Sequence, residues 1–321
     1  MTTTSAQRTS DPDVTSGSEV VRSSAGPQSS SPAELDQGAV MSQRLLVGAS
    51  LCVLAALLFG FLVNLTLVGS LKHSRDQVVA FDTLRTALAK ATAPVGPSDS
   101  AGKLFPLGTP VALIKIPKLG IEQTVLEGTT SRVLVSGPGH QRSSAMPGQA
   151  GSVIIMGRKD AYGGPFSGVK NMYRGQLIET TSGQGRATYK VIAVSRGEKA
   201  SVAPANLPAN RLTLITASGY RFVPSGITRV DAELITPAQN PPTQLLSDAS
   251  LTPAEAALAG DTSAWIALVF WIQALLIASV GMTWAWIRWG KWQAWIVGVP
   301  VILFIGLSLA GQASLLLPNL I

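Results

Sequence analysis

The 321-residue sequence predicts an all-β domain, folded as a barrel or a sandwich, that three transmembrane α-helices anchor behind a disordered N-terminal tail. Charged residues make up only 13% of the chain, about half of the roughly 25% that is usual in globular proteins. Three apolar stretches are each long enough to cross a bilayer, which takes about 20 residues. Between the first and the second stretch, short β-rich runs alternate with turns rich in Gly and Pro.

The N-terminal residues 1–43 are rich in Ser, Thr, Gly and Pro and poor in aromatic and branched apolar side chains. Such a segment buries too little apolar surface to offset the entropy of ordering it, so we expect a disordered tail. The segment is also too long and too polar to be the start of a cleaved signal peptide.

Residues 44–71 form the first predicted transmembrane helix. No charged residue lies between Leu45 and Leu71, and Arg44 and Lys72 flank this run. No cleavage site of small residues followed by a polar segment is apparent, so we expect a retained anchor.

Residues 264–287 and 292–317 are predicted as the second and third transmembrane helices, joined by a short basic turn. Several Trp residues surround this turn, which is typical of a helical hairpin at one membrane face. The positive-inside rule places the turn in the cytoplasm. We therefore expect the tail 1–43 inside the cell, and the segment 72–264 and the C-terminus outside, at the plasma membrane.

The segments 72–110 and 237–263 connect the membrane helices to the β-rich part. We expect a juxtamembrane helix over 76–92, followed by a linker that begins where Pro and Gly become frequent. The polar, Pro-containing residues 237–263 are predicted as a second linker.

Residues 111–236 are predicted to form the β domain, because β-rich runs there are separated by Gly and Pro turns. The expected strands are Val111–Ile116, Gln123–Leu126, Ser152–Met156, Gln176–Thr181, Thr188–Val194, Arg211–Thr216 and Val230–Ile235.

Several classes of site are excluded by composition. Cys52 is the only cysteine and lies in the first apolar run, so neither an intrachain disulfide nor a zinc site with several thiolates is possible. With only two histidines, His73 and His140, we expect no metal, and no motif indicates a cofactor or a nucleic acid. The net charge of +7 suits contact with lipid headgroups or anionic wall polymers, and equally a solvated surface.

Five motifs within the β domain resemble, in order and spacing, those of the sortases, most closely the actinobacterial housekeeping type. The motifs are Ala112-Leu-Ile-Lys-Ile-Pro-Lys-Leu-Gly120, Glu127-Gly-Thr129, Gly137-Pro-Gly-His140, Pro147-Gly-Gln149 and Gly163-Gly-Pro-Phe166. Sortases are membrane-anchored cysteine transpeptidases that cut a sorting signal and join the protein to the cell wall or to a pilin. The resemblance implies a closed eight-stranded β-barrel.

The resemblance also implies where three catalytic groups should lie, and two are replaced. The position of the family's histidine is Arg158, and the position of its cysteine nucleophile is Ala217. The position of the family's arginine is retained as Arg229. Since alanine has no nucleophile and an arginine side chain does not exchange its proton near neutral pH, cysteine transpeptidation is not expected.

Three functions are left open by these residues. The first is a catalytically inactive sortase-like protein that binds or scaffolds surface proteins, an active sortase or wall precursors. The second is an enzyme with non-thiol chemistry at Ser218 or Thr216, for which His140 is the candidate base. The third is a structural subunit of a membrane complex that makes its contacts through the C-terminal hairpin.

The candidate ligand-binding residues are His140, Arg158, Thr216, Ala217, Ser218 and Arg229. Arg158 and Lys159, beside Arg229, would form an anion-binding cleft for a carboxylate or phosphate. The alternative is that Arg158 pairs with Asp160 or Glu233 and only fills space.

Overall fold

The computed structural model describes residues 51, 55, 57–99, 101–200, 206–242 and 246–321. The predicted disordered tail 1–43 and most of residues 44–56 of the predicted first span lie outside these residues. Chain contacts divide the protein into a unit Met1–Leu54 and a unit Ala55–Ile321, and the second unit contains all the elements described below.

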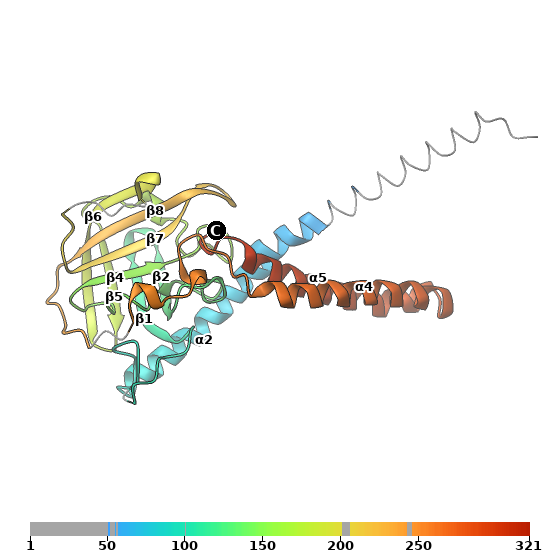
Figure 1. The fold of residues 1–321 in the computed structure, drawn as a ribbon, viewed down its shortest axis with the longest axis horizontal. Coiled ribbons are helices and arrows are strands. Elements are labelled where there is room, and N and C mark those ends of the chain that lie inside the picture. Colours follow the sequence, from blue (N-terminus) through green and yellow to red (C-terminus); the bar gives the residue numbers. More distant parts are fainter. Residues whose placement is uncertain (1–50, 52–54, 56, 100, 201–205, 243–245) are drawn as a thin grey trace, which may run out of the picture. The chain divides into compact units, whose positions relative to one another are not determined.

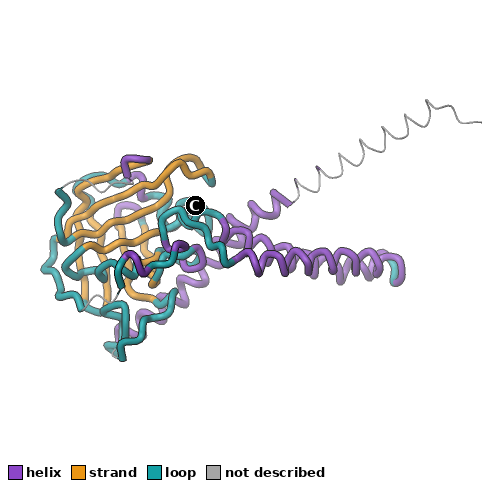
Figure 2. Tube along the Cα trace, in the orientation of Figure 1, coloured by secondary structure: helices purple, strands orange, loops and turns teal. Residues whose placement is uncertain are grey.

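Eight strands close into a barrel in the order β1-β2-β3-β4-β7-β8-β6-β5 (Figures 1 and 2). The strands are β1 Pro110–Ile116, β2 Ile121–Glu127, β3 Gly139–His140, β4 Ser152–Met156, β5 Leu177–Ser182, β6 Gly185–Gly197, β7 Arg211–Tyr220 and β8 Val223–Leu234. The predicted closed all-β barrel is confirmed. The strand patterns in the sequence predict only seven of these strands, because the two residues of β3 are too few to show an alternating pattern.

Strands β4 and β7 run parallel and side by side, with a register from Ser152 opposite Arg211 to Met156 opposite Ile215. Strand β8 pairs antiparallel with β7 on its other side. Parallel strands end at the same edge of a sheet, so the residues that follow β4 lie next to the last part of β7.

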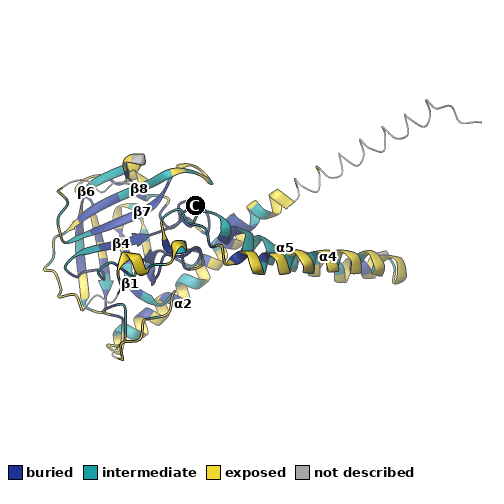
Figure 3. Ribbon diagram, in the orientation of Figure 1, coloured by how far each residue is buried: buried dark blue, intermediate teal, exposed yellow. Residues whose placement is uncertain are grey.

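The barrel interior is the main hydrophobic core, and buried residues are frequent in β4, β7 and β8 (Figure 3). The core residues follow the alternation of side chains along each strand. Ile155 of β4, Leu214 of β7 and Val230 of β8 point inward and are fully buried. Met156 and Ile215, neighbours of these residues in sequence, point outward and belong to a separate apolar cluster. The outer face of β4 and β7 is therefore also buried, beneath segments from elsewhere in the chain.

Three helices in the described part of the chain are long and apolar enough to cross a membrane: Leu57–Ala89, Ala264–Arg288 and Trp292–Leu316. The last two correspond to helices α4 (Ala264–Arg288) and α5 (Lys291–Leu316), over the segments predicted to form the hairpin.

The first of these helices is continuous, although the sequence suggests a span ending at Leu71 and a separate helix over 76–92. A π-helical stretch η1, Asn64–Val68, leads directly into α2, Gly69–Ala89. Only polar and charged residues separate the two predicted pieces, and without Pro or a capping Gly a helix does not end there. A short helix α3, Ser131–Leu134, follows β2.

Tyr189 of β6 secures the turn at Pro147-Gly-Gln149. Its side chain is fully buried, and its hydroxyl oxygen accepts a hydrogen bond of 2.7 Å from the Gly148 N–H. Burial raises the pKa of Tyr189 to about 12, so the phenol stays neutral through the physiological range.

We expect Tyr189→Phe to lower the free energy of unfolding by about 1–3 kcal/mol, because the Gly148 N–H is left buried without an acceptor. Tyr220→Phe is the matched control, since Tyr220 is 87% exposed and its hydroxyl is solvated. Denaturant titration of the purified full chain measures both losses, and equal losses would contradict the assignment.

Candidate functional site

The candidate site lies where β4 ends beside the last part of β7. The Gly157 N–H donates to the Ile215 carbonyl oxygen at 3.0 Å, which extends the β4–β7 pairing by one residue. Arg158 follows Gly157, and Ala217 lies two residues beyond Ile215, opposite Ile227 of β8. The fold thus brings the two sequence-predicted positions to one edge of the barrel.

Arg158 is a fully buried cation whose side-chain donors meet backbone oxygens. One terminal nitrogen donates to the Ser131 carbonyl oxygen at 3.1 Å, and the other to the Ile321 carbonyl oxygen at 3.4 Å. The guanidinium lies over the Tyr162 ring, 5.0 Å from its centroid, and the Nε atom has no partner among the described residues. Burial lowers the pKa of Arg158 to about 10, which leaves it protonated at neutral pH.

Asp160 and Glu233, considered above as partners of Arg158, form no ion pair with it within the described residues. Asp160 instead pairs with Lys159 at 3.4 Å. The Lys159 ammonium also donates to the Gly219 carbonyl oxygen at 2.8 Å. This contact ties the residues after β4 to the end of β7.

Arg229 of β8 has a different partner from Arg158. Its Nε donates to both carboxylate oxygens of Asp231, at 3.0 and 2.9 Å, and Asp231 also accepts from the Thr213 hydroxyl at 2.8 Å. Arg158, Lys159 and Arg229 thus each have separate partners in the described structure. An anion would have to displace these contacts to bind all three.

The two hydroxyls considered as nucleophiles lie on the other face of β7 from Ala217, because successive side chains of a strand alternate. Thr216 is 1% exposed, and its hydroxyl has no partner among the described residues. Ser218 is half-buried opposite Gly226 of β8.

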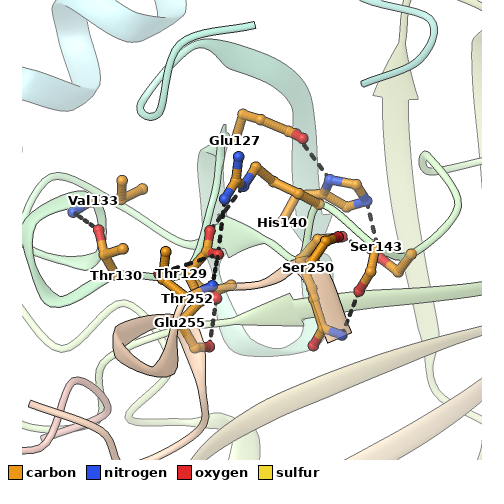
Figure 4. Close-up of polar contacts among 12 residues, drawn as sticks. Glu127, Thr129, Thr130, Val133, His140, Ser143, Ser250, Thr252 and Glu255 are labelled. Carbon is orange, nitrogen blue, oxygen red and sulfur yellow. Dashed lines mark hydrogen bonds and ion pairs between the residues drawn. The ribbon is translucent and has the colours of Figure 1, made fainter. Parts of the chain in front are cut away.

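His140 of β3 has both ring nitrogens engaged elsewhere (Figure 4). Its Nδ1 is 2.9 Å from Oε2 of Glu127, and its Nε2 is 2.9 Å from the Ala145 carbonyl oxygen and 3.1 Å from the Ser144 hydroxyl. Neither Thr216 nor Ser218 is among these partners. In this arrangement His140 holds the loop after β3.

A second polar pair, which was not predicted, connects the linker 237–263 to the barrel (Figure 4). Arg142 donates two hydrogen bonds to the Glu255 carboxylate, at 2.8 and 2.9 Å, and Glu255 is only 1% exposed. The Thr129 hydroxyl donates to the Glu255 carbonyl oxygen at 2.7 Å. Opposite charges that lie 113 residues apart give no local sequence signal, so this pair was not predictable.

The C-terminal residues after α5 lie over the candidate site. Asn319 and Leu320 are fully buried and Ile321 is 3% exposed. Leu320 packs in the same cluster as Met156, Ile215 and Ala217. The burial of this segment was not predicted, since its only local signals are Pro318 as a helix stop and Asn319 as a polar residue after an apolar run.

A groove of about 970 Å³ lies elsewhere, between α2, the start of β1 and the linker. Val79, Ala80 and Thr83 of α2 line it, and they belong to a helix that is a candidate membrane span. Arg158, Ala217 and Arg229 are not among the groove's lining residues. We therefore take the β4–β7 edge, and not the groove, as the candidate site.

Residues 114–224 match the family model described as the Sortase domain. With the closed barrel, this match supports a sortase-like domain over this part of the chain. The chain is similar to Sortase D of Bacillus subtilis (strain 168), with 24% identity over 115 residues, which is 36% of this chain and 57% of that protein. The chain therefore spans less than two thirds of this curated relative.

Several solved structures of sortases are similar to part of the chain. A Clostridium perfringens Sortase D5 transpeptidase is 21% identical, with a TM-score of 0.39 over 52% of this chain and 100% of that one. Sortase A from Corynebacterium diphtheriae is 21% identical, with a TM-score of 0.37 over 54% of this chain and 93% of that one. Sortase E from Streptomyces avermitilis is 27% identical, with a TM-score of 0.36 over 47% of this chain and 100% of that one.

We expect Arg142→Ala to lower the free energy of unfolding by roughly 3 kcal/mol, because it leaves the Glu255 carboxylate buried without its cation. The control is Arg132→Ala, which removes a 4.0 Å pair with Asp261 from a side chain that is 64% exposed. That loss should stay below about 1 kcal/mol. Denaturation midpoints of the full chain measure the stability loss of each variant. Similar losses would contradict the stabilising role of the Arg142–Glu255 pair.

The His140–Glu127 pair should make stability depend on pH. Burial alone would lower the pKa of His140, but the Glu127 carboxylate outweighs it and raises the pKa above 6.5. Since the folded state binds the proton more tightly, the stabilisation is complete below pH 6.5 and is lost as pH rises through the folded-state pKa.

Glu127→Gln should flatten this dependence, since the amide keeps the shape of the side chain without its charge. Unfolding midpoints measured from about pH 6 to about pH 9 should fall in the native chain and change less in the variant. A native profile that is flat over this range would count against the pair.

Proposed function

We propose that this sortase-like protein binds peptide segments of surface proteins or wall precursors at the β4–β7 edge and does not transfer them through a thiol. The observation that carries the proposal is the pair of side chains at this edge, Arg158 and Ala217. The membrane helices would hold the barrel outside the cell, with the N-terminus in the cytoplasm.

The chemistry of these residues supports binding without acyl transfer. Acyl transfer needs a nucleophile and a group that exchanges a proton near neutral pH. Ala217 supplies no nucleophile, and Arg158 stays protonated with a pKa of about 10. The only thiol in the sequence belongs to Cys52, in the first predicted span.

The surroundings of Ala217 suit an extended peptide. Met156 and Ile215 offer an apolar surface on the outer face of the sheet, and the buried Arg158 offers donors to carbonyl oxygens. Backbone hydrogen bonds with pockets for alternate side chains are a common mode of peptide recognition. Surface proteins with sorting signals, an active sortase and wall precursors are the candidate partners.

We expect the full chain, in detergent or nanodiscs, to leave Leu-Pro-x-Thr-Gly and Leu-Ala-x-Thr-Gly peptides intact while binding at least one of them. Mass spectrometry measures cleavage and transfer, and fluorescence anisotropy of labelled peptides measures binding. Ala217→Trp should abolish binding by filling the apolar surface, whereas Tyr220→Trp, at an exposed position of β7, should not.

Cleavage by the native chain would overturn the proposal and would point to a hydroxyl nucleophile at Thr216 or Ser218. The double variant Arg158→His and Ala217→Cys restores the side chains of the resembled family. Cleavage by this variant alone would support a peptide-binding edge that lacks only its reactive groups.

A further inference from the structure

We infer that the C-terminal segment Pro318–Ile321 is a built-in peptide ligand of the β4–β7 edge and must leave before another peptide binds there. The inference deepens the proposed function, and it rests on that function only for the identity of the competing peptide. It assigns to the edge a short apolar peptide ligand that forms a turn and has a buried leucine.

The apolar contact centres on Leu320, which is fully buried. Its side chain packs with Leu134 of α3 and with Met156, Ile215 and Ala217 on the outer face of the sheet. The barrel core lies on the opposite face of β4 and β7 and contains no residue of the C-terminal segment. The leucine therefore covers an apolar surface that the barrel itself does not need to fill.

The polar contacts follow the backbone of the segment. The Lys159 N–H donates to the Leu320 carbonyl oxygen at 2.9 Å, and Arg158 donates to the Ile321 carbonyl oxygen at 3.4 Å. The segment itself forms a turn, in which the Ile321 N–H donates to the Pro318 carbonyl oxygen at 3.2 Å. Contacts to its backbone oxygens recognise it without requiring one particular sequence.

Asn319 adds the contacts that depend on a side chain. Its amide nitrogen donates to the carbonyl oxygens of Thr129 and Ala256, both at 2.9 Å, and its backbone N–H donates to the Ala259 carbonyl oxygen at 2.8 Å. The asparagine thus joins the turn after β2 to the linker, beside the leucine.

Two features favour a ligand that can leave over a fixed part of the barrel. The barrel closes through eight strands, none of which comes from the segment. Its polar contacts are also incomplete within the described residues, since Oδ1 of Asn319 and Nε of Arg158 are buried without partners. Unpaired buried polar groups cost free energy, which lowers the cost of release.

The test uses the reactivity of a reporter thiol beneath Leu320. Ala217, which is 2% exposed, is replaced by Cys in a Cys52→Ser background of the full chain in nanodiscs, and labelling by a maleimide is followed over time. We expect Leu320→Asp to raise the labelling rate at least ~10-fold, because a carboxylate is not tolerated in the apolar cluster. Leu320→Met, which keeps the apolar contact, should label as slowly as the parent.

A second reporter separates release of the segment from unfolding. Tyr220→Cys, in the same background, lies on the same strand at a position that is 87% exposed. Its labelling rate should be the same with and without Leu320→Asp. Equal rates at Ala217→Cys with and without Leu320→Asp would overturn the inference, and so would a change at both reporters.

A third test asks whether a separate peptide can replace the C-terminal segment. A chain that ends before Pro318 should label fast at Ala217→Cys, and an acetylated Leu-Pro-Asn-Leu-Ile peptide should restore slow labelling. Because a tethered segment acts at an effective concentration of about millimolar, the peptide is used up to that range. The same peptide with Asp in place of its second Leu should not protect, and failure of the parent peptide to protect would overturn the inference.

The two proposals fail in different ways. Protection by Leu-Pro-Asn-Leu-Ile without binding of any sorting-signal peptide to the shortened chain supports the built-in ligand and rejects the proposed function. Binding of a sorting-signal peptide to the intact chain with no effect of Leu320→Asp on labelling rejects the built-in ligand alone.

Discussion

The parallel pairing of β4 with β7 is the constraint on which the site depends. It brings the residues after β4 next to Ala217, although the two strands are far apart in the sequence. A parallel pair needs a crossover connection, and here the crossover contains β5 and β6, which continue the barrel. The geometry of the edge is thus set by barrel closure and not by local sequence.

The same pairing explains how one sheet carries two apolar faces. Ile155 and Leu214 fill the barrel, whereas Met156 and Ile215 meet Leu320 on the outside. Burial on both faces turns the ends of β4 and β7 into a near-continuous apolar run, as expected for central parallel strands. A buried cation, Arg158, lies beside this surface because its donors find carbonyl oxygens of other segments.

Sequence patterns predicted what depends on local periodicity. Strand β4 was expected at its observed bounds, and the apolar hairpin segments were found from composition. Contacts between distant segments could not be predicted from the sequence, including the Arg142–Glu255 pair and the burial of Leu320. Neither involves a motif, and each exists only because the fold brings remote residues together. That Arg158 and Ala217 replace reactive groups stays a prediction from the resemblance.

The helix Leu57–Ala89 is continuous and supports the barrel as one rigid element. Its 33 residues measure about 50 Å at about 1.5 Å per residue, well beyond a hydrocarbon layer of roughly 30 Å. Gln77, on the same helix, holds the barrel through hydrogen bonds with the backbone of Thr124 and Ser136. The helix therefore joins a candidate membrane span to the barrel without a break, and its length sets the distance between the two.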